Sequence, residues 1–262
     1  MARPEHDFAP WPGPPRRSIV LCTIPRSGST LLGEALYFAG GLGCPLEYFH
    51  RGFRPYFEAR WNTTGTDQLK NAVWRWRTDA SGTLSIKLFW RDVEDLAGEM
   101  SDGPRIGDPA DATADDYRAL FGRIAPLVPN PVFVHLCRRD EVRGAVSGLM
   151  AADSGVWRSL PGKTNNTPRP VAYDYERIAG LIAYARHCHA HWRGFFAANG
   201  IVPFVLTYEE LTRDYTETVA RLLRHLGSEA PVPQARLRRQ SGAQTESFAL
   251  RFLQENAARQ EV

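Results

Sequence analysis

The chain has 262 residues, of which 43% are hydrophobic and 23% charged, and its 32 basic and 29 acidic residues give a formal net charge of +3. A chain of this length and apolar content can bury a full core, which argues against a disordered protein. Because the charge is nearly balanced and no long basic run occurs, we expect no nucleic-acid partner. The four cysteines form no Cys-x-x-Cys pair, which indicates a reducing, cytoplasmic location.

Residues 1–17 form the first recognisable segment. They contain several prolines and no apolar stretch, so they predict a flexible, Pro-rich leader rather than a signal peptide or an anchor. No later apolar run is long enough to span a bilayer, and we therefore expect no transmembrane segment. Residues 18–262 are expected to form one domain.

Short apolar runs then alternate with helical patterns. The runs predict buried parallel strands at 19–24, 83–89, 132–137 and 204–207. The helical patterns lie at 31–38, 114–127, 142–151, 175–199 and 215–226. This alternation predicts an α/β fold with a doubly wound, mostly parallel sheet and helices on both faces.

A polar turn joins the first predicted strand to the first predicted helix. It reads Pro25-Arg26-Ser27-Gly28-Ser29-Thr30. Consecutive amides, hydroxyls and the Arg26 guanidinium stand at the positive end of a helix, which suits an anionic ester. Pro25 stiffens the turn, and Gly28 permits close approach. The six residues therefore predict a P-loop-like anion site.

This turn departs from the phosphate-binding loop of nucleoside triphosphatases. In their motif, Gly-x-x-x-x-Gly-Lys-Ser/Thr, a glycine and a lysine stand at the positions that Thr23 and Ser29 occupy here. No predicted strand ends in an aspartate placed to hold a metal ion. A nucleotide or small-molecule kinase is therefore only an alternative interpretation, and we expect no metal cofactor.

The loop, in its full form Thr23-Ile-Pro-Arg-Ser-Gly-Ser-Thr-Leu-Leu, resembles the 5′-phosphosulfate loop of sulfotransferases that use 3′-phosphoadenosine 5′-phosphosulfate (PAPS). Further matching segments are Pro45-Leu-Glu47-Tyr-Phe49, Lys87-Leu-Phe-Trp90, Arg138-Arg-Asp140, Ala145-Val-Ser147, Trp157 and Tyr208-Glu-x-Leu211. Together they resemble the bacterial trehalose 2-sulfotransferase family of carbohydrate sulfotransferases, from about residue 18 to the C-terminus.

This resemblance implies an enzyme that moves the sulfuryl group of PAPS to a hydroxyl of a carbohydrate or glycolipid by in-line displacement, without a metal. A non-catalytic protein that binds PAPS or its desulfated product, 3′-phosphoadenosine 5′-phosphate (PAP), is a second alternative. The resemblance allows a homodimer, which the sequence itself does not show.

The resemblance also implies roles for the anion-binding residues. Arg26 and the loop residues 25–30 would bind the 5′-phosphosulfate and stabilise the departing phosphate. Arg138 and Ser147 would recognise the 3′-phosphate, and Arg139 would share or replace the role of Arg138.

Two charged residues are candidates for the transfer step itself. Glu47 is the expected general base, which removes the proton of the acceptor hydroxyl. Lys87 lies within an apolar strand and needs an anionic partner, either the bound sulfate or phosphate or an internal acid.

A segment rich in aromatic and basic residues predicts a wall for the acceptor. The candidate acceptor-binding residues are Tyr48, Phe49, His50, Arg51 and Trp157. In a separate helix, His187 and His191 share a face, and His189 lies between them. Because a third ligand at a fixed spacing is missing, these histidines predict no metal site.

Overall fold

The structure is a computed structural model of the chain that describes residues 1–100, 106–157, 169–237 and 242–260. Among these residues, strands β1 (Arg17–Thr23), β2 (Thr83–Phe89), β3 (Pro131–Cys137) and β4 (Phe204–Thr207) form a sheet in the order β2-β1-β3-β4. Every neighbouring pair is parallel, and Leu21 of β1 pairs with Lys87 of β2 and with Val134 of β3. The four predicted strands and the α/β class are confirmed.

The helices of the described residues are α1 (Ser29–Ala39), α2 (Arg54–Trp61), α3 (Gly65–Arg77), α4 (Trp90–Met100), α5 (Ala114–Ile124), α6 (Glu141–Ser154), α7 (Tyr175–Ala198), α8 (Tyr208–Arg213), α9 (Tyr215–His225) and α10 (Ala243–Gln260), with short 3-10 helices at Pro4–His6 and Ala125–Leu127. The sequence patterns predict α1, α5, α6, α7 and α9 but miss the other five α-helices. Of these, α2 buries only Phe57 and α8 has six residues, so neither carries a long apolar stripe.

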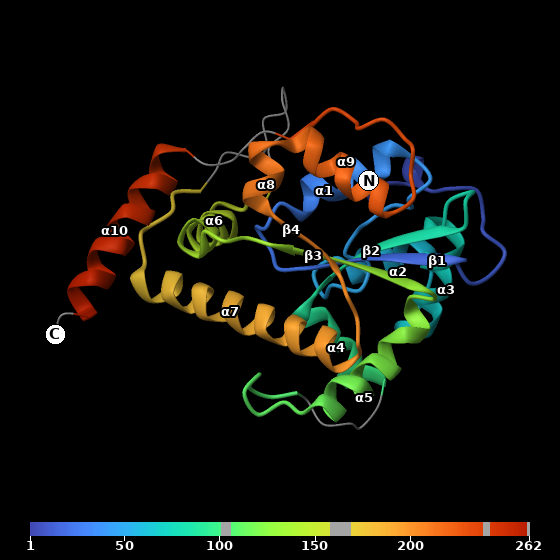
Figure 1. The fold of residues 1–262 in the computed structure, drawn as a ribbon, viewed down its shortest axis with the longest axis horizontal. Helices are drawn as coiled ribbons and strands as arrows, with labels where there is room; N and C mark the ends of the chain where they lie inside the picture. Colours follow the sequence, from blue (N-terminus) through green and yellow to red (C-terminus); the bar gives the residue numbers. More distant parts are fainter. Residues whose placement is uncertain (101–105, 158–168, 238–241, 261–262) are drawn as a thin grey trace.

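Different helices cover the two faces of the sheet (Figure 1). Ile19 and Leu21 of β1 belong to an apolar cluster with α1, α8 and α9. Val20 and Cys22 belong to the opposite cluster, which includes α3, α4, α5 and α7. The alternation arises because successive strand side chains point to opposite faces. Since both faces are covered, the strands are mostly apolar, which makes them recognisable in the sequence.

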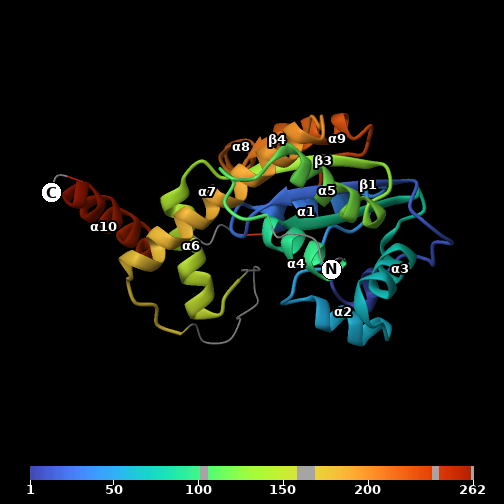
Figure 2. The same ribbon diagram turned by 90° about the horizontal axis from the view of Figure 1, so that it is seen from below.

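A third apolar cluster joins α6, α7 and α10. In it, Val146 of α6, Ile178 of α7 and Ala249 of α10 are fully buried. Figure 2 shows α10 leading away from the sheet with the C-terminus at its tip. No helix within the described ranges has both the length and the apolar character needed to cross a membrane.

The N-terminal residues, expected to form a flexible leader, lie against the domain. Phe8 packs on the core, and the Asp7 carboxylate forms ion pairs with Arg60 and Arg77. Arg77 is fully buried, so Asp7 supplies a counter-charge that this guanidinium needs. The proline-rich composition hides this contact because the partner arginines come from α2 and α3.

Candidate active site

The loop after β1 and the residues after β3 lie at the same edge of the sheet. β1 stands between β2 and β3 in the sheet. The chain passes from β1 to β2 on one side of β1 and then from β2 to β3 on the other side, so the strand order reverses at β1. Open α/β sheets bind ligands in the crevice outside the carboxyl ends of the strands at such a switch point. The strand order therefore brings together the predicted anion-binding residues that follow β1 and those that follow β3.

The loop itself adopts an unusual backbone conformation. Arg26 has a φ of 68° and Gly28 a φ of 88°, both in the left-handed region. A Cβ at position 28 would lie 2.8 Å from Cδ2 of Tyr208, the first residue of α8. Only glycine fits beneath this ring, so Gly28 permits the close approach of Tyr208 as well as the turn.

Two buried hydroxyls stabilise the loop from within. The Ser27 hydroxyl donates to the carbonyl oxygen of Ile24 at 2.7 Å, and the Thr23 hydroxyl donates to that of Leu136 at 2.8 Å. Ser27 is fully buried. This corrects the expectation that its hydroxyl is turned towards a ligand: that hydroxyl closes the turn.

The first turn of α1 presents its backbone amides without a side-chain cap. Gly28 occupies the N-cap position, and no side chain of the described residues bonds to this end of the helix. In contrast, α5, α6, α7, α8 and α9 each begin with an Asp or Thr side chain that accepts an amide hydrogen bond. The amides of Ser29 and Thr30 therefore stand where an anion binds to a helix N-terminus.

Two arginines meet beside this loop. Nε of Arg26 donates a hydrogen bond of 3.0 Å to the Ser147 hydroxyl, across a sequence separation of 121 residues. Nη1 of Arg138 donates a hydrogen bond of 3.0 Å to the carbonyl oxygen of Arg26. Burial lowers the pKa of the Arg26 guanidinium, and the neighbouring charge of Arg138 lowers it further. Two cations this close repel each other, so an anion bound between them is favoured.

Arg138 and Arg139 make different contacts, and Arg139 is exposed. The Glu209 carboxylate accepts hydrogen bonds of 3.1 Å from the amides of Arg139 and Asp140. The Arg138 guanidinium lies 4.3 Å from the centre of the Tyr208 ring, above the loop. Arg138 is therefore the arginine of this pair that faces the predicted anion site.

Glu47 and Lys87 are partners of each other. Lys87 Nζ lies 2.5 Å from Oε1 of Glu47, and Lys87 is only 2% exposed. The Lys87 amide also donates to the carbonyl oxygen of Leu46, which places the segment before Glu47 alongside β2. The internal acid that the sequence analysis allows for Lys87 is thus the predicted general base.

Two residues predicted to contact the acceptor lie in the core. Tyr48 is fully buried, packs against Phe57 and Trp61, and donates its hydroxyl to the carbonyl oxygen of Cys44. Phe49 is 4% exposed, although its ring lines one edge of a cavity of about 450 Å³. The prediction of Tyr48 in an acceptor wall is therefore wrong. Tyr48 is instead a core aromatic, because α2 supplies its apolar partners Phe57 and Trp61.

The other predicted acceptor residues are at least partly exposed. Nδ1 of His50 lies 2.6 Å from Oδ1 of buried Asp92, and this hydrogen bond raises the pKa of His50. Arg51 is exposed and lines the same cavity as Phe49. The Trp157 side chain is exposed, while its carbonyl oxygen accepts a 2.7 Å hydrogen bond from Nη1 of Arg26.

Two residues of this site have no role assigned from the sequence, although Tyr208 stands in one of the segments that carry the resemblance. Tyr208 covers Gly28 and stacks under Arg138, and its position directly after β4 is a signal that it lies at the same edge of the sheet. Asp92 orients His50 and also accepts the Phe89 amide at 3.0 Å. Its place two residues after the Lys87-Leu-Phe-Trp90 segment offers no comparable signal.

Comparison with known proteins agrees with this geometry. The model of the family described as Stf0 sulphotransferase matches residues 18–255. The trehalose 2-sulfotransferase of Mycobacterium tuberculosis is 31% identical over 265 aligned residues, which cover 90% of this chain and 94% of that protein. The trehalose 2-sulfotransferase of Mycolicibacterium smegmatis is 27% identical over 245 residues, covering 87% of this chain and 91% of that protein. The chain therefore belongs to the Stf0 sulphotransferase family.

Proposed function

We propose that this sulfotransferase moves the sulfuryl group of PAPS to a hydroxyl of trehalose or a related carbohydrate or glycolipid. The observation that carries the proposal is the contact of Arg26 with Ser147 and Arg138 at the switch point of the sheet. It places two guanidinium groups beside the uncapped N-terminus of α1, which suits a donor with negative charge at two positions. The two related trehalose 2-sulfotransferases support a sugar acceptor.

In the proposed step, the acceptor oxygen attacks sulfur while the bond from sulfur to the 5′-phosphate oxygen breaks. Negative charge then develops on that phosphate oxygen. Arg26 and the amides of Ser29 and Thr30 stabilise this charge without reorganising, because they are held in place before the reaction. Arg138, with the Ser147 hydroxyl, binds the 3′-phosphate.

The acceptor proton is assigned to the Glu47 carboxylate. The buried ammonium group of Lys87, in β2, forms an ion pair with Oε1 of Glu47 and so fixes the orientation of the Glu47 carboxylate. The cavity beside Phe49 is a candidate place for the acceptor. Arg51, Arg54, Glu94 and Asp95 line it, and such charged groups can hydrogen-bond to sugar hydroxyls.

The function is tested by incubating the full chain with PAPS and trehalose and detecting sulfated disaccharide by mass spectrometry. Lipid-linked sugars and other disaccharides serve as further acceptors. We expect PAPS-dependent sulfation of at least one carbohydrate. Tight binding of PAP with no transfer to any of these acceptors would instead support a binding protein, and ATP-dependent phosphorylation of an acceptor would support a kinase.

A second prediction concerns the 3′-phosphate. Replacement of Arg138 by alanine is expected to weaken PAP binding by about 10- to 100-fold, because charge-assisted hydrogen bonds to the phosphate are lost. Binding of 5′-AMP, which lacks this phosphate, should change much less. Calorimetric titration of both nucleotides measures the difference.

Arg139→Ala is the matched control for this measurement, because it removes the same group from the adjacent position. It should keep the preference for PAP over 5′-AMP. If Arg139→Ala lost the preference and Arg138→Ala kept it, the assignment of the 3′-phosphate to Arg138 would be wrong.

A further inference from the structure

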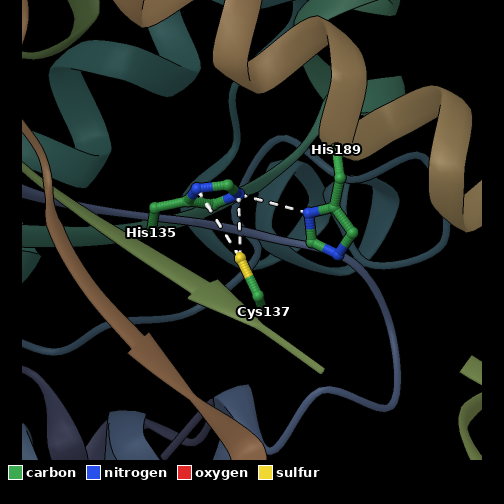
Figure 3. A group of neighbouring side chains, drawn as sticks. All are labelled: His135, Cys137 and His189. Carbon is green, nitrogen blue, oxygen red and sulfur yellow. Dashed lines mark hydrogen bonds between the residues drawn. The ribbon is translucent and has the colours of Figure 1, made fainter. Parts of the chain in front are cut away.

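Three side chains with metal-binding atoms gather between β3 and α7 (Figure 3). His135 and Cys137 are two residues apart on β3, so both point to the face that α7 covers, and His189 of α7 meets them there. Nε2 of His135 lies 3.2 Å from Nδ1 of His189 and 3.4 Å from Sγ of Cys137. All three ligand-type atoms lie within 4.8 Å of one another.

We propose that His135, Cys137 and His189 bind a Zn²⁺ ion that ties α7 to the carboxyl end of β3. In tetrahedral zinc sites, Zn–N bonds of about 2.0–2.1 Å and a Zn–S bond of about 2.3 Å place the ligand atoms roughly 3.4–3.6 Å apart. The distances of 3.2 and 3.4 Å are close to these spacings. Sγ of Cys137 also lies 3.7 Å from Nδ1 of His135, so zinc binding requires a side-chain rotation that turns Nε2 of His135 alone towards the sulfur. Two imidazoles and one thiolate are also a donor set that zinc favours.

Zinc binding changes the protonation of one ligand. A neutral imidazole has one nitrogen with a free lone pair, whereas a cysteine must lose its proton to bind a metal as a thiolate. Zinc binding therefore forms two Zn–N bonds and one Zn–S bond and releases the Cys137 proton to the solvent.

A second group of potential ligands, Glu94, His187 and His191, is less suited to a metal. Both ring nitrogens of His191 are occupied: Nδ1 lies 2.8 Å from the Tyr117 hydroxyl, and Nε2 lies 3.1 Å from the carbonyl oxygen of Gly107. The His191 ring also stacks on Trp90. A metal bound to either nitrogen of His191 would have to replace one of these hydrogen bonds, and we therefore use this group as the competing site in the test.

The proposed site revises the interpretation of the helix histidines. In the sequence, His189 lacks a third ligand at a fixed spacing. The structure supplies two ligands from β3, which lies far from α7 along the chain but next to it in space. Among the described residues, no fourth histidine, cysteine or acidic side chain belongs to the group. The fourth position is therefore assigned to water or another small ligand.

The test uses the full chain after treatment with a chelator. We expect dialysis against Zn²⁺ to leave one equivalent bound by elemental analysis, with the release of one proton and a rise in the unfolding temperature. Co²⁺ should give the near-ultraviolet charge-transfer absorption of a cobalt–thiolate bond. Cys137→Ser should abolish that absorption. Both Cys137→Ser and His189→Gln should weaken Zn²⁺ binding by more than ~100-fold. Loss of a group that only hydrogen-bonds to a metal ligand weakens binding by ~10- to 100-fold.

Two matched controls separate this site from its alternatives. Cys188→Ser removes a buried thiol next to His189 that is outside the group, and His187→Gln removes a histidine of the competing group. Both should bind Zn²⁺ like the parent protein, and circular dichroism verifies that every variant is folded. The proposal is overturned if the parent binds no Zn²⁺, if Cys137→Ser and His189→Gln retain full affinity, or if His187→Gln alone loses the metal.

Discussion

Replacement of Arg26 by glycine is expected to lower kcat/KM for sulfuryl transfer by about 100- to 1,000-fold. The loss follows because the guanidinium is a donor held beside the position where the leaving phosphate gains charge, and removal of such a donor has effects of this size. Binding of the donor PAPS should weaken less, since the charge on the 5′-phosphate is larger in the transition state than in the bound donor. Steady-state assays with PAPS and an acceptor, and calorimetry with PAPS in the absence of an acceptor, separate the two effects.

Arg26→Ala is the control that isolates the backbone. Both variants lose the hydrogen bonds to Ser147 and Trp157, but alanine retains a Cβ in the left-handed conformation at a φ of 68°. Glycine adopts this conformation without that strain, so the glycine variant should be more stable than the alanine variant by roughly 1 kcal/mol. Urea denaturation measures this difference. A glycine variant that transfers sulfuryl within tenfold of the parent rate would contradict the role assigned to Arg26.

Replacement of Glu47 by glutamine is expected to abolish transfer and also to destabilise the fold by about 3–5 kcal/mol. Transfer fails because the amide cannot accept the acceptor proton. The fold is destabilised because Lys87, which is 2% exposed, loses the carboxylate that lies 2.5 Å from its ammonium group. Transfer assays and urea denaturation of the same preparation measure the two losses.

The double variant Glu47→Gln/Lys87→Met distinguishes these two effects. Methionine fills a similar volume without a charge, so the double variant should recover most of the free energy of unfolding. Transfer should remain absent, while PAP binding, measured by calorimetry, remains within a few fold of the parent. An active double variant would exclude Glu47 as the base. A double variant no more stable than Glu47→Gln would show that the two residues are not energetically coupled.

Much of the fold could be predicted because its elements depend on local patterns. The strands form mostly apolar runs because helices cover both faces of the sheet, and the loop of residues 25–30 has a recognisable order of Pro, Arg, Gly and hydroxyl residues. The helices α2 and α8 could not be predicted in this way. One buries a single side chain and the other is too short to show a period.

The roles of neighbouring residues with similar chemistry were harder to separate. Arg138 and Arg139 are neighbours of the same residue type, so the sequence does not separate their roles. In the structure they differ in their contacts, because the Glu209 carboxylate accepts a hydrogen bond from the Arg139 amide. Likewise, Tyr48 lies in an irregular segment without a period that would reveal its face. Its burial depends on Phe57 and Trp61, which α2 brings against it.

The sequence by itself determined the α/β class, the residue order of the loop at 25–30 and the family resemblance, because each depends on short segments of neighbouring residues. Only the tertiary structure decided which partners the charged side chains have: Glu47 for Lys87, the Ser147 hydroxyl for Arg26, and the Arg26 carbonyl oxygen for Arg138. Buried charges require partners at distances of a few ångströms. Which partner lies at such a distance is a consequence of strand order and helix packing, and apolar periodicity along one segment carries no information about it.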